Sequence, residues 1–377
     1  MKRIRLGNYC KITAGGDKPK VFSIIKNDEC FVPVYSNGIE NNGLVGYTNK
    51  ATISEESVTV AARGSCGYAF FRDTPYVPII RLISIIPFDD NVLDTKYLYY
   101  LLKLLPYQGI GSVQSQITVP QISDYSIDFI DDNIKQKKIA KTLSLLDYKI
   151  ENNNKINAEL ESMAKTLYDY WFLQFEFPNE NGKPYKSSGG KMVWNEELKR
   201  EIPEGWKVSK IGDILEEANK SKIQVNDAKE KGKYPFFTSG EKILCYDDYL
   251  VKGFNIFLNT GGNPDIKAYM GKCAYSTDTW CVSAKEYSYI LFYYLLKLMP
   301  QFEQLFFAGS GLKHLQKDSL KNQYILLPDE KVLRNFNNIC ELIWKKITNC
   351  LIENQELTAL RDFLLPLLMN GQVTFKE

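Results

Sequence analysis

The chain repeats itself with a period of about half its length. The segment Tyr99–Leu104 reads YYLLKL, and the same six letters recur 194 residues later at Tyr293–Leu298. A pattern of apolar residues around Glu159 recurs 197 residues later around Glu356, with apolar residues again at the apolar positions. Since the matches keep their order and nearly the same offset, they indicate an internal duplication in which each half builds one copy of a common plan.

Each half begins with a mixed, turn-rich globular segment and continues into a long helix. A length of 377 residues suits two or three domains of ordinary size. The predicted fold class is α+β, with two globular domains of mixed α/β structure separated by two long helices that form an antiparallel coiled coil, related by a pseudo-two-fold repeat. The expected boundaries are 1–130 and 207–330 for the domains, 131–172 and 331–370 for the helices, 173–206 for a connector and 371–377 for a tail.

The long helices carry a heptad pattern. In the first, apolar residues alternate in steps of four and three, as at Ile139, Leu143, Leu146 and Ile150. A narrow seam of this kind is typical of a two-helix coiled coil. Two asparagines, Asn157 and Asn354, occupy equivalent seam positions. They are either buried, where an amide fixes the register of the helices, or solvated at the edge of the seam, and the sequence leaves both readings open.

The ends of both helices are more apolar than one seam requires. Such a surface suits a docking site for another protein, or else it packs on the chain's own globular segments. The candidate partner-binding residues are Leu167, Tyr170, Trp171, Phe172, Leu364, Leu367 and Leu368.

Both globular segments place polar turns after β-rich runs at matched positions. Glycine lets a backbone approach a ligand closely, and Ser, Thr, Asn and Arg supply the donors and acceptors that suit phosphates and base edges. Arg63 is the leading candidate for a contact to guanine or phosphate, although such turns also serve only to connect strands. The candidate DNA-binding residues are Ser36, Asn37, Arg63, Ser65, Gln114, Gln116 and Thr118 in the first half and Thr238, Ser239, Asn259, Thr260, Asn263, Lys313 and His314 in the second.

Charge and cysteine usage limit the class of protein. The net charge is +2, so any nucleic-acid surface must be a local patch. The eight cysteines form no CxxC pair and there is one histidine, which argues against a zinc site and favours reduced thiols in a cytoplasmic protein. No apolar run is long enough to predict a membrane span.

Motifs for chemistry are missing from the sequence. It contains no glycine-rich AdoMet loop, no [DN]PP[YF] tetrapeptide and no GxxxxGK[ST] phosphate loop. The lone His314 has no carboxylate or cysteine partner at a diagnostic spacing. We therefore expect a chain with no catalytic residues, no metal and no cofactor of its own.

Three segments resemble the specificity subunits of type I restriction–modification enzymes. They are Met163–Phe172 with Phe177-Pro178, the connector from Asn181–Tyr185 to Pro203–Trp206, and the end of the second helix, Leu357–Gly371. The layout and length of that family match the whole chain.

The resemblance implies a non-catalytic subunit whose two target recognition domains each read half of a bipartite site in double-stranded DNA. It also implies two modification (methyltransferase) subunits as partners, bound in part through the long helices, and restriction subunits added for cleavage. AdoMet, ATP and Mg²⁺ would belong to those partners.

Two other classes of protein remain open from the residues. A non-catalytic coiled-coil scaffold with two protein-binding domains would show no salt-dependent affinity for DNA. A stand-alone DNA enzyme would be active as the purified chain, and the missing motifs argue against it.

Overall fold

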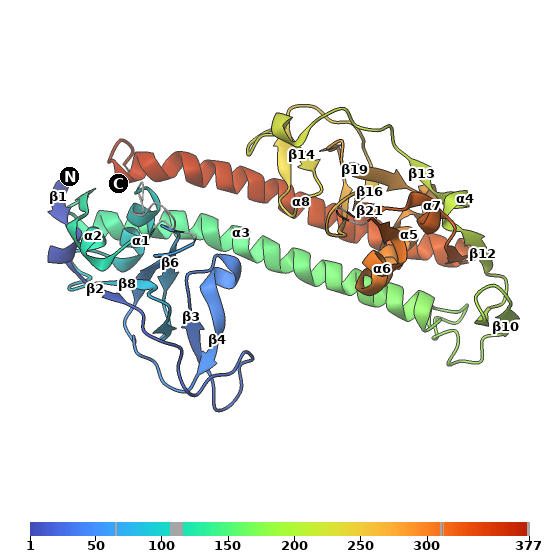
Figure 1. The fold of residues 1–377 in the computed structure, drawn as a ribbon, viewed down its shortest axis with the longest axis horizontal. Coiled ribbons are helices and arrows are strands. Elements are labelled where there is room, and N and C mark those ends of the chain that lie inside the picture. Colours follow the sequence, from blue (N-terminus) through green and yellow to red (C-terminus); the bar gives the residue numbers. More distant parts are fainter. Residues whose placement is uncertain (65, 106–115, 310, 312, 375–377) are drawn as a thin grey trace. The chain divides into compact units, whose positions relative to one another are not determined.

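The computed structural model describes residues 1–64, 66–105, 116–309, 311 and 313–374, and the chain forms two compact units (Figure 1). The first unit comprises Met1–Glu151 and Gln355–Glu377, and the second comprises Asn152–Asn354. Each unit therefore contains one globular segment and a portion of both long helices.

The first unit contains three small sheets. Four antiparallel strands pair in the order β2-β8-β5-β6, three pair as β4-β3-β7 with β3 parallel to β7, and β1 pairs with β9. A short helix, α1, packs beside β5 and β6, and Asp94 caps it by accepting a hydrogen bond from the Tyr97 amide. The elements are β1 (Lys2–Arg5), β2 (Cys10–Ala14), β3 (Val32–Tyr35), β4 (Leu44–Thr48), β5 (Ser57–Val60), β6 (Ala69–Arg72), β7 (Val77–Pro78), β8 (Ile83–Pro87), α1 (Thr95–Lys103), α2 (Val119–Asp124) and β9 (Ser126–Phe129).

The second unit repeats the three sheets of this plan and adds two further two-stranded sheets. The repeated sheets have the orders β13-β19-β16-β17, β15-β14-β18 and β12-β22, and β14 is parallel to β18 as β3 is to β7. The elements are β12 (Lys207–Lys210), α4 (Ile211–Ile214), β13 (Glu216–Glu217), β14 (Tyr234–Phe237), β15 (Leu244–Tyr246), β16 (Phe254–Asn259), β17 (Ile266–Met270), β18 (Ala274–Tyr275), β19 (Thr279–Ser283), α5 (Ser288–Leu298), α6 (Phe302–Phe306), β20 (Phe307–Ala308), β21 (His314–Leu315), α7 (Lys317–Lys321) and β22 (Tyr324–Leu327). The identical strand order confirms the duplication and the mixed α/β class.

Two long helices complete the fold. Helix α3 (Asn133–Tyr168) continues into a π-helical turn, Asp169–Leu173, and α8 runs over Glu330–Met369. In the second unit, Asn153 of α3 contacts Asn354 of α8, while Tyr168 contacts Phe336. Later residues of α3 thus meet earlier residues of α8, and the helices are antiparallel, as predicted. The hairpin β10 (Met192–Asn195) and β11 (Arg200–Pro203) lies between α3 and the second globular segment in sequence.

The core of each unit takes side chains from both long helices. In the first unit, Ile139 and Leu143 of α3 and Leu365 and Leu368 of α8 join the core beneath the sheets. In the second unit, the core includes residues of the π-helical turn together with Phe336 and Ile347 of α8. Both globular segments are therefore anchored to the helices by buried apolar surface, which is the main favourable term in folding.

The seam asparagines are buried. Asn157 is 7% exposed and Asn354 is 9% exposed, so the reading in which they are solvated at the seam's edge is wrong. The Nδ2 of Asn153 donates to Asn354 Oδ1 at 3.0 Å and to Glu353 Oε2 at 2.8 Å, and Asn354 Nδ2 donates to Asn154 Oδ1 at 2.8 Å. In contrast, Asn157 Oδ1 is buried without a hydrogen-bond partner.

This contrast predicts opposite effects of two matched substitutions. Asn157→Leu removes a buried, unpaired oxygen, so we expect it to raise the free energy of unfolding by about 1 kcal/mol. Asn153→Leu breaks two hydrogen bonds and leaves Asn354 Oδ1 unpaired, so we expect a loss of about 1–3 kcal/mol. Chemical denaturation of the two variants beside the unchanged chain measures both. Equal destabilisation by the two changes would contradict this description of the seam.

Candidate nucleic-acid interface

Three loops of the first unit meet at one end of its sheets, and Asn37 joins them. The Nδ2 of Asn37, which follows β3, donates to the Ile80 carbonyl at 2.7 Å, and its Oδ1 accepts from the Ala62 amide at 2.8 Å. Both polar atoms of this side chain are thus used inside the protein. The Asn37 side chain therefore holds the loops together. It was predicted to contact DNA, and the structure gives its amide group a structural role.

Two arginines line a pocket of about 230 Å³ at this cluster. Arg63 and Arg81 share it with Gln116, Thr118 and apolar residues. Within the described part of the chain, neither guanidinium has an ion pair or a side-chain hydrogen bond. Arginine only donates, so these unpaired groups suit acceptors such as phosphate oxygens or guanine O6 and N7.

An unusual turn presents Arg81. Ile80 and Arg81 both have positive φ, 53° and 61°, a conformation that non-glycine residues seldom adopt. The amides of Ile80 and Arg81 donate to the carbonyls of Gly16 and Gly15, at 2.9 and 3.1 Å, and so hold the turn in place. Backbone strain of this kind is found preferentially at binding and active sites, which supports a functional reading of the turn.

The second unit brings the matching loops together in the same way. In the first unit, an isolated antiparallel β-bridge pairs the backbones of Arg63 and Gln116. In the second unit, the same kind of bridge pairs the backbones of Gly261 and His314. The amide of Ile117 donates to the Ala62 carbonyl at 2.9 Å, and the amide of Leu315 donates to the Thr260 carbonyl at 3.0 Å. The loop cluster is therefore part of the duplicated plan.

The chemistry at the matched positions differs between the units. Ile83 pairs with Val60 in the first unit as Trp280 pairs with Leu258 in the second, so Arg81 corresponds to Asp278. Hydroxyls of Ser239 and Thr260 donate to the Asp278 carbonyl and hold its turn. A shared scaffold thus carries a positive side chain in one copy and a negative one in the other.

Most other predicted contact residues are engaged inside the protein. Thr118 caps α2, Thr238 accepts from the Gly240 amide, and Lys313 pairs with Glu303 at 2.6 Å. Asn259 is 4% exposed and donates to the carbonyls of Ser239 and Asn263. The predicted residues with exposed or partly exposed side chains and no internal partner within the described ranges are Ser36, Arg63, Gln116, Asn263 and His314. Ser65 and Gln114 lie outside the described residues.

Arg81 was missed by the sequence reasoning. It follows β7 without a nearby Gly-Ser or Asn-Gly turn, which is the signal that selected the other loops. Only the repeat alignment with the turn at Asp278 could have pointed to it. The one-letter sequence carries no other mark of a loop at Ile80-Arg81, because the positive φ values arise at non-glycine residues.

The predicted partner-binding residues divide into buried and exposed sets. Trp171, Phe172 and Leu368 are only 5%, 3% and 2% exposed, because they pack in the chain's own cores. Tyr170 is exposed, and Leu167, Leu364 and Leu367 are partly buried. Large apolar side chains off the seam are also exposed, at Leu145, Tyr148 and Phe363 in the first unit and at Met163 and Leu342 in the second. These exposed side chains are therefore the large apolar groups that the helices leave uncovered within each unit.

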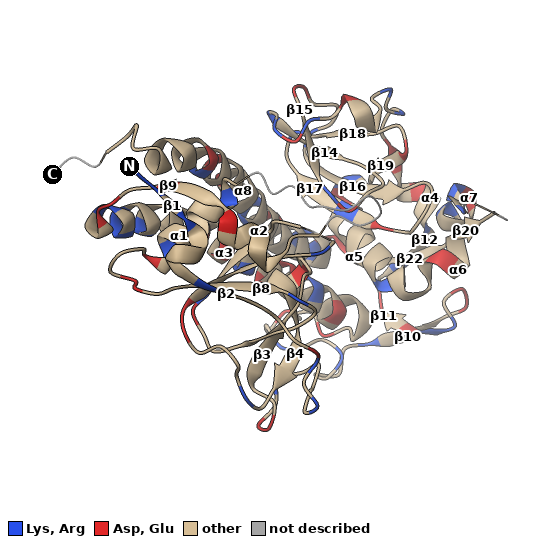
Figure 2. Cartoon of the chain, turned by 60° about the vertical axis from the view of Figure 1, so that its left-hand side comes forward, with Lys and Arg blue, Asp and Glu red and all other residues tan. Residues whose placement is uncertain are grey.

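Charge is spread over both units. Figure 2 shows positions of basic and acidic residues interspersed along strands, loops and helices, in keeping with a net charge of +2. Among the described residues, no group of three or more His, Cys, Asp or Glu side chains is placed to hold a metal ion, and no helix is long and apolar enough to cross a membrane. The eight cysteines are free thiols.

Comparison with known proteins points to one family. The family model for the type I restriction modification DNA specificity domain matches residues 1–162 and 203–351, one stretch in each half of the chain. The MjaIX type I restriction enzyme specificity subunit of Methanocaldococcus jannaschii is 27% identical over 352 residues, covering 85% of this chain and 78% of that protein. A putative type I specificity subunit of Mycoplasma pneumoniae is 34% identical over 172 residues, covering 45% of this chain and 50% of that one.

A solved structure shows the same fold. The type I restriction–modification S subunit from M. genitalium superposes with a TM-score of 0.64 at 18% identity, covering 100% of this chain and 96% of that one. The chain therefore shares its overall fold with that protein.

Proposed function

Because the chain belongs to the type I restriction–modification DNA specificity family, we propose that it reads a bipartite DNA sequence on behalf of a methyltransferase complex, with each loop cluster contacting one half of the site. The observation that carries this proposal is the duplicated loop cluster with unlike side chains. Two copies of one scaffold that differ at the matched positions Arg81 and Asp278 are suited to reading two different short sequences.

In the first unit, Arg63 and Arg81 act as donors to DNA. A bidentate contact from arginine to guanine O6 and N7 is the commonest specific contact in the major groove, and contacts to phosphate fix the register of the protein. Gln116 lines the same pocket and can pair with adenine in the same bidentate manner. In the second unit, His314 and Asn263 take the corresponding place.

The long helices serve assembly and spacing. Exposed apolar side chains along α3 and α8, such as Tyr148, Met163 and Phe363, dock two modification subunits, and restriction subunits join them for cleavage. The unbroken helices set the number of unspecified base pairs between the half-sites. AdoMet, ATP and Mg²⁺ belong to the partner subunits, and this chain contributes recognition without catalysis.

Salt dependence separates this function from that of a protein-binding scaffold. Contacts to DNA phosphates release counterions, so log K falls with log salt at a slope of about −0.9 per phosphate contact. We expect the complex of this chain with its modification subunits to lose roughly a hundredfold or more in affinity between about 50 and 200 mM salt. Fluorescence anisotropy on labelled duplex DNA measures this, with the modification subunits alone as the control. If adding the chain changes neither the affinity nor the slope, the scaffold reading is correct.

A further inference from the structure

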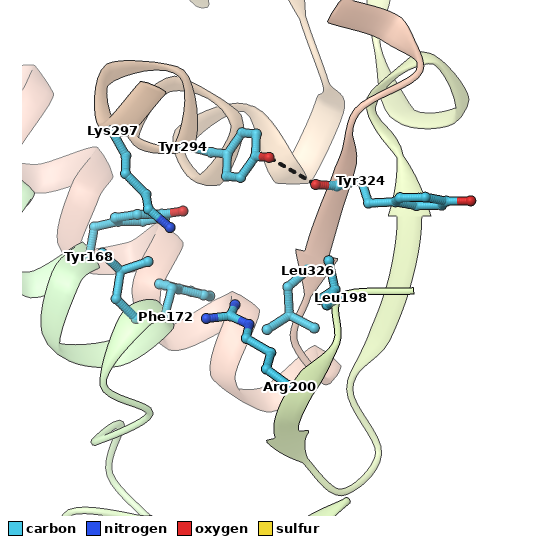
Figure 3. Close-up of a pocket in the computed structure, with 9 residues that line it drawn as sticks. Tyr168, Phe172, Leu198, Arg200, Tyr294, Lys297, Tyr324 and Leu326 are labelled. Carbon is cyan, nitrogen blue, oxygen red and sulfur yellow. Dashed lines mark hydrogen bonds between the residues drawn. The ribbon is translucent and has the colours of Figure 1, made fainter. Parts of the chain in front are cut away.

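The second unit contains a pocket whose lining includes no residue of the loop cluster. Its cavity of about 270 Å³ lies between the end of α3, the β10–β11 hairpin, α5 and β22 (Figure 3). The first unit has no counterpart of this hairpin within its described residues. The pocket is therefore not part of the duplicated plan that forms the two loop clusters.

Two cations line this cavity, and neither forms an ion pair in the described part of the chain. They are Lys297 of α5 and Arg200 of β11. Burial and the neighbouring Arg200 lower the pKa of Lys297, while Asp169 acts in the opposite direction. Asp169 itself is engaged by Lys165 at 2.6 Å.

In the first unit, the equivalent lysine lies near a carboxylate. Lys103, which matches Lys297 in the repeated YYLLKL segment, lies 3.9 Å from Asp147. The α8 residue that corresponds to Asp147 at the repeat offset of 197 is Trp344, which is uncharged and donates to the Tyr293 hydroxyl. The second unit thus keeps the lysine, lacks the matching acid and adds Arg200.

A buried phenol completes the polar end of the pocket. Tyr168 is 3% exposed, and its hydroxyl has no hydrogen-bond partner in the described part of the chain. Figure 3 shows this hydroxyl, the Lys297 ammonium and the Arg200 guanidinium directed into the same space. Burial raises the pKa of Tyr168, so the hydroxyl stays protonated and can donate. The hydroxyl of Tyr294 is already used, since it donates to the Tyr324 carbonyl at 2.9 Å.

The remaining walls are aromatic and aliphatic. Phe172, Leu198, Tyr294 and Leu326 surround the three donors. Positively charged hydrogen-bond donors favour an oxyanion as ligand, and the apolar walls favour a hydrophobic group attached to that oxyanion. The cavity is smaller than the range of about 300–1,000 Å³ typical of drug-sized ligands, so the ligand is small.

We propose that this pocket binds a small organic oxyanion, a carboxylate or phosphate carried on an aromatic body, held by Lys297, Arg200 and the hydroxyl of Tyr168. The ring of the ligand lies against the apolar walls. The site is separate from the loop clusters, so it stands or falls independently of the proposed DNA recognition.

Calorimetric titration of the full chain tests this site with three probes. Phenyl phosphate and benzoate carry the two anionic heads on one ring, and benzyl alcohol is the uncharged match. We expect at least one anion to bind with a Kd of about 1 mM or tighter and benzyl alcohol to bind at least about tenfold more weakly. Equal binding of benzyl alcohol, or a Kd weaker than about 10 mM for both anions, overturns the proposal.

Matched variants locate the site. Lys297→Met and Arg200→Met keep the apolar stems, and each should weaken binding by about tenfold or more. Tyr168→Phe keeps the ring in the core and should weaken binding by about threefold or more. Lys346→Met, at an exposed lysine of α8, makes the same change in net charge and should leave binding unchanged. If the pocket variants bind as the unchanged chain does, the proposal is wrong.

A final titration distinguishes a pocket that binds a free small ligand from a pocket that a partner subunit fills. The same titration on the chain assembled with its modification subunits should give a similar Kd. Loss of binding on assembly would mean that a partner's own side chain fills the pocket, which overturns the small-ligand proposal. Methylation by the Lys297→Met complex should keep its site, so a failure of DNA recognition would be recognised separately.

Discussion

Exchanging residues 1–130 for the equivalent segment of another family member changes one half of the recognised DNA site and leaves the other half intact. The first and last strands of the first globular segment, β1 and β9, pair with each other, so the segment begins and ends in the same sheet. The described residues of its loop cluster all come from this segment, from the Gly15 and Gly16 carbonyls that hold the Arg81 turn to Thr118 in the pocket. The chimera should therefore recognise the half-site of the protein that donated the segment.

The structure also sets a condition on that exchange. The segment packs on Ile139 and Leu143 of α3 and on Leu365 and Leu368 of α8, so the donor segment must keep apolar side chains facing these positions. The matched control is the reciprocal exchange of residues 207–330, which should change only the other half-site. Methylome sequencing of hosts that express each chimera reads the outcome. A chimera that altered both half-sites, or neither, would show that the two halves do not read DNA independently.

Replacing Arg63 and Arg81 together by methionine should abolish efficient recognition of the first half-site. Methionine keeps an apolar stem but cannot donate, and a lost bidentate contact to a base costs about 1–3 kcal/mol, or roughly 5–150-fold in affinity per arginine. Because neither guanidinium has an internal partner among the residues that the structure describes, the change should leave the stability of the fold nearly unaltered. Affinity for duplex DNA and methylation at variant half-sites measure the effect.

Single variants separate the two kinds of contact. Loss of a base contact relaxes specificity at one position, whereas loss of a phosphate contact weakens all sequences alike and reduces the salt slope by about one. Arg334→Met is the control, because Arg334 is exposed on α8 and forms an ion pair with Glu330 one turn away. An Arg63/Arg81 variant that methylates the same sites as efficiently as the Arg334 variant would remove these arginines from the interface.

Periodic features of this fold were predictable from the sequence. The repeat of YYLLKL predicted the duplicated plan, and the heptad steps from Ile139 onward predicted the paired helices. Both features depend on local spacing along the chain. The roles of loop side chains were not predictable in the same way. Asn37 and Asn259 look like free amides in the sequence, but their partners, the carbonyls of Ile80 and Ser239, come from distant segments that meet only in the folded chain.

The helix ends show a second limit of pattern reading. The sequence left open whether Trp171 and Phe172 form a docking surface or pack on the chain's own globular segments. They lie in the π-helical turn at the end of α3 and pack against Phe336 and Trp206 in the core. Apolar character alone does not separate the two readings, because both require an apolar side chain. The exposed apolar residues that remain on the helices, such as Phe363, fall outside the seam and so were not selected.

Methylome sequencing of a host that expresses this chain with its modification subunit tests the central claim most directly. The account predicts one asymmetric methylated site made of two short specified blocks, separated by a constant number of unspecified base pairs, with block centres about one helical turn or 10 bp apart. The site should vanish when this chain is omitted. A continuous short site, or methylation that persists without the chain, would contradict the account.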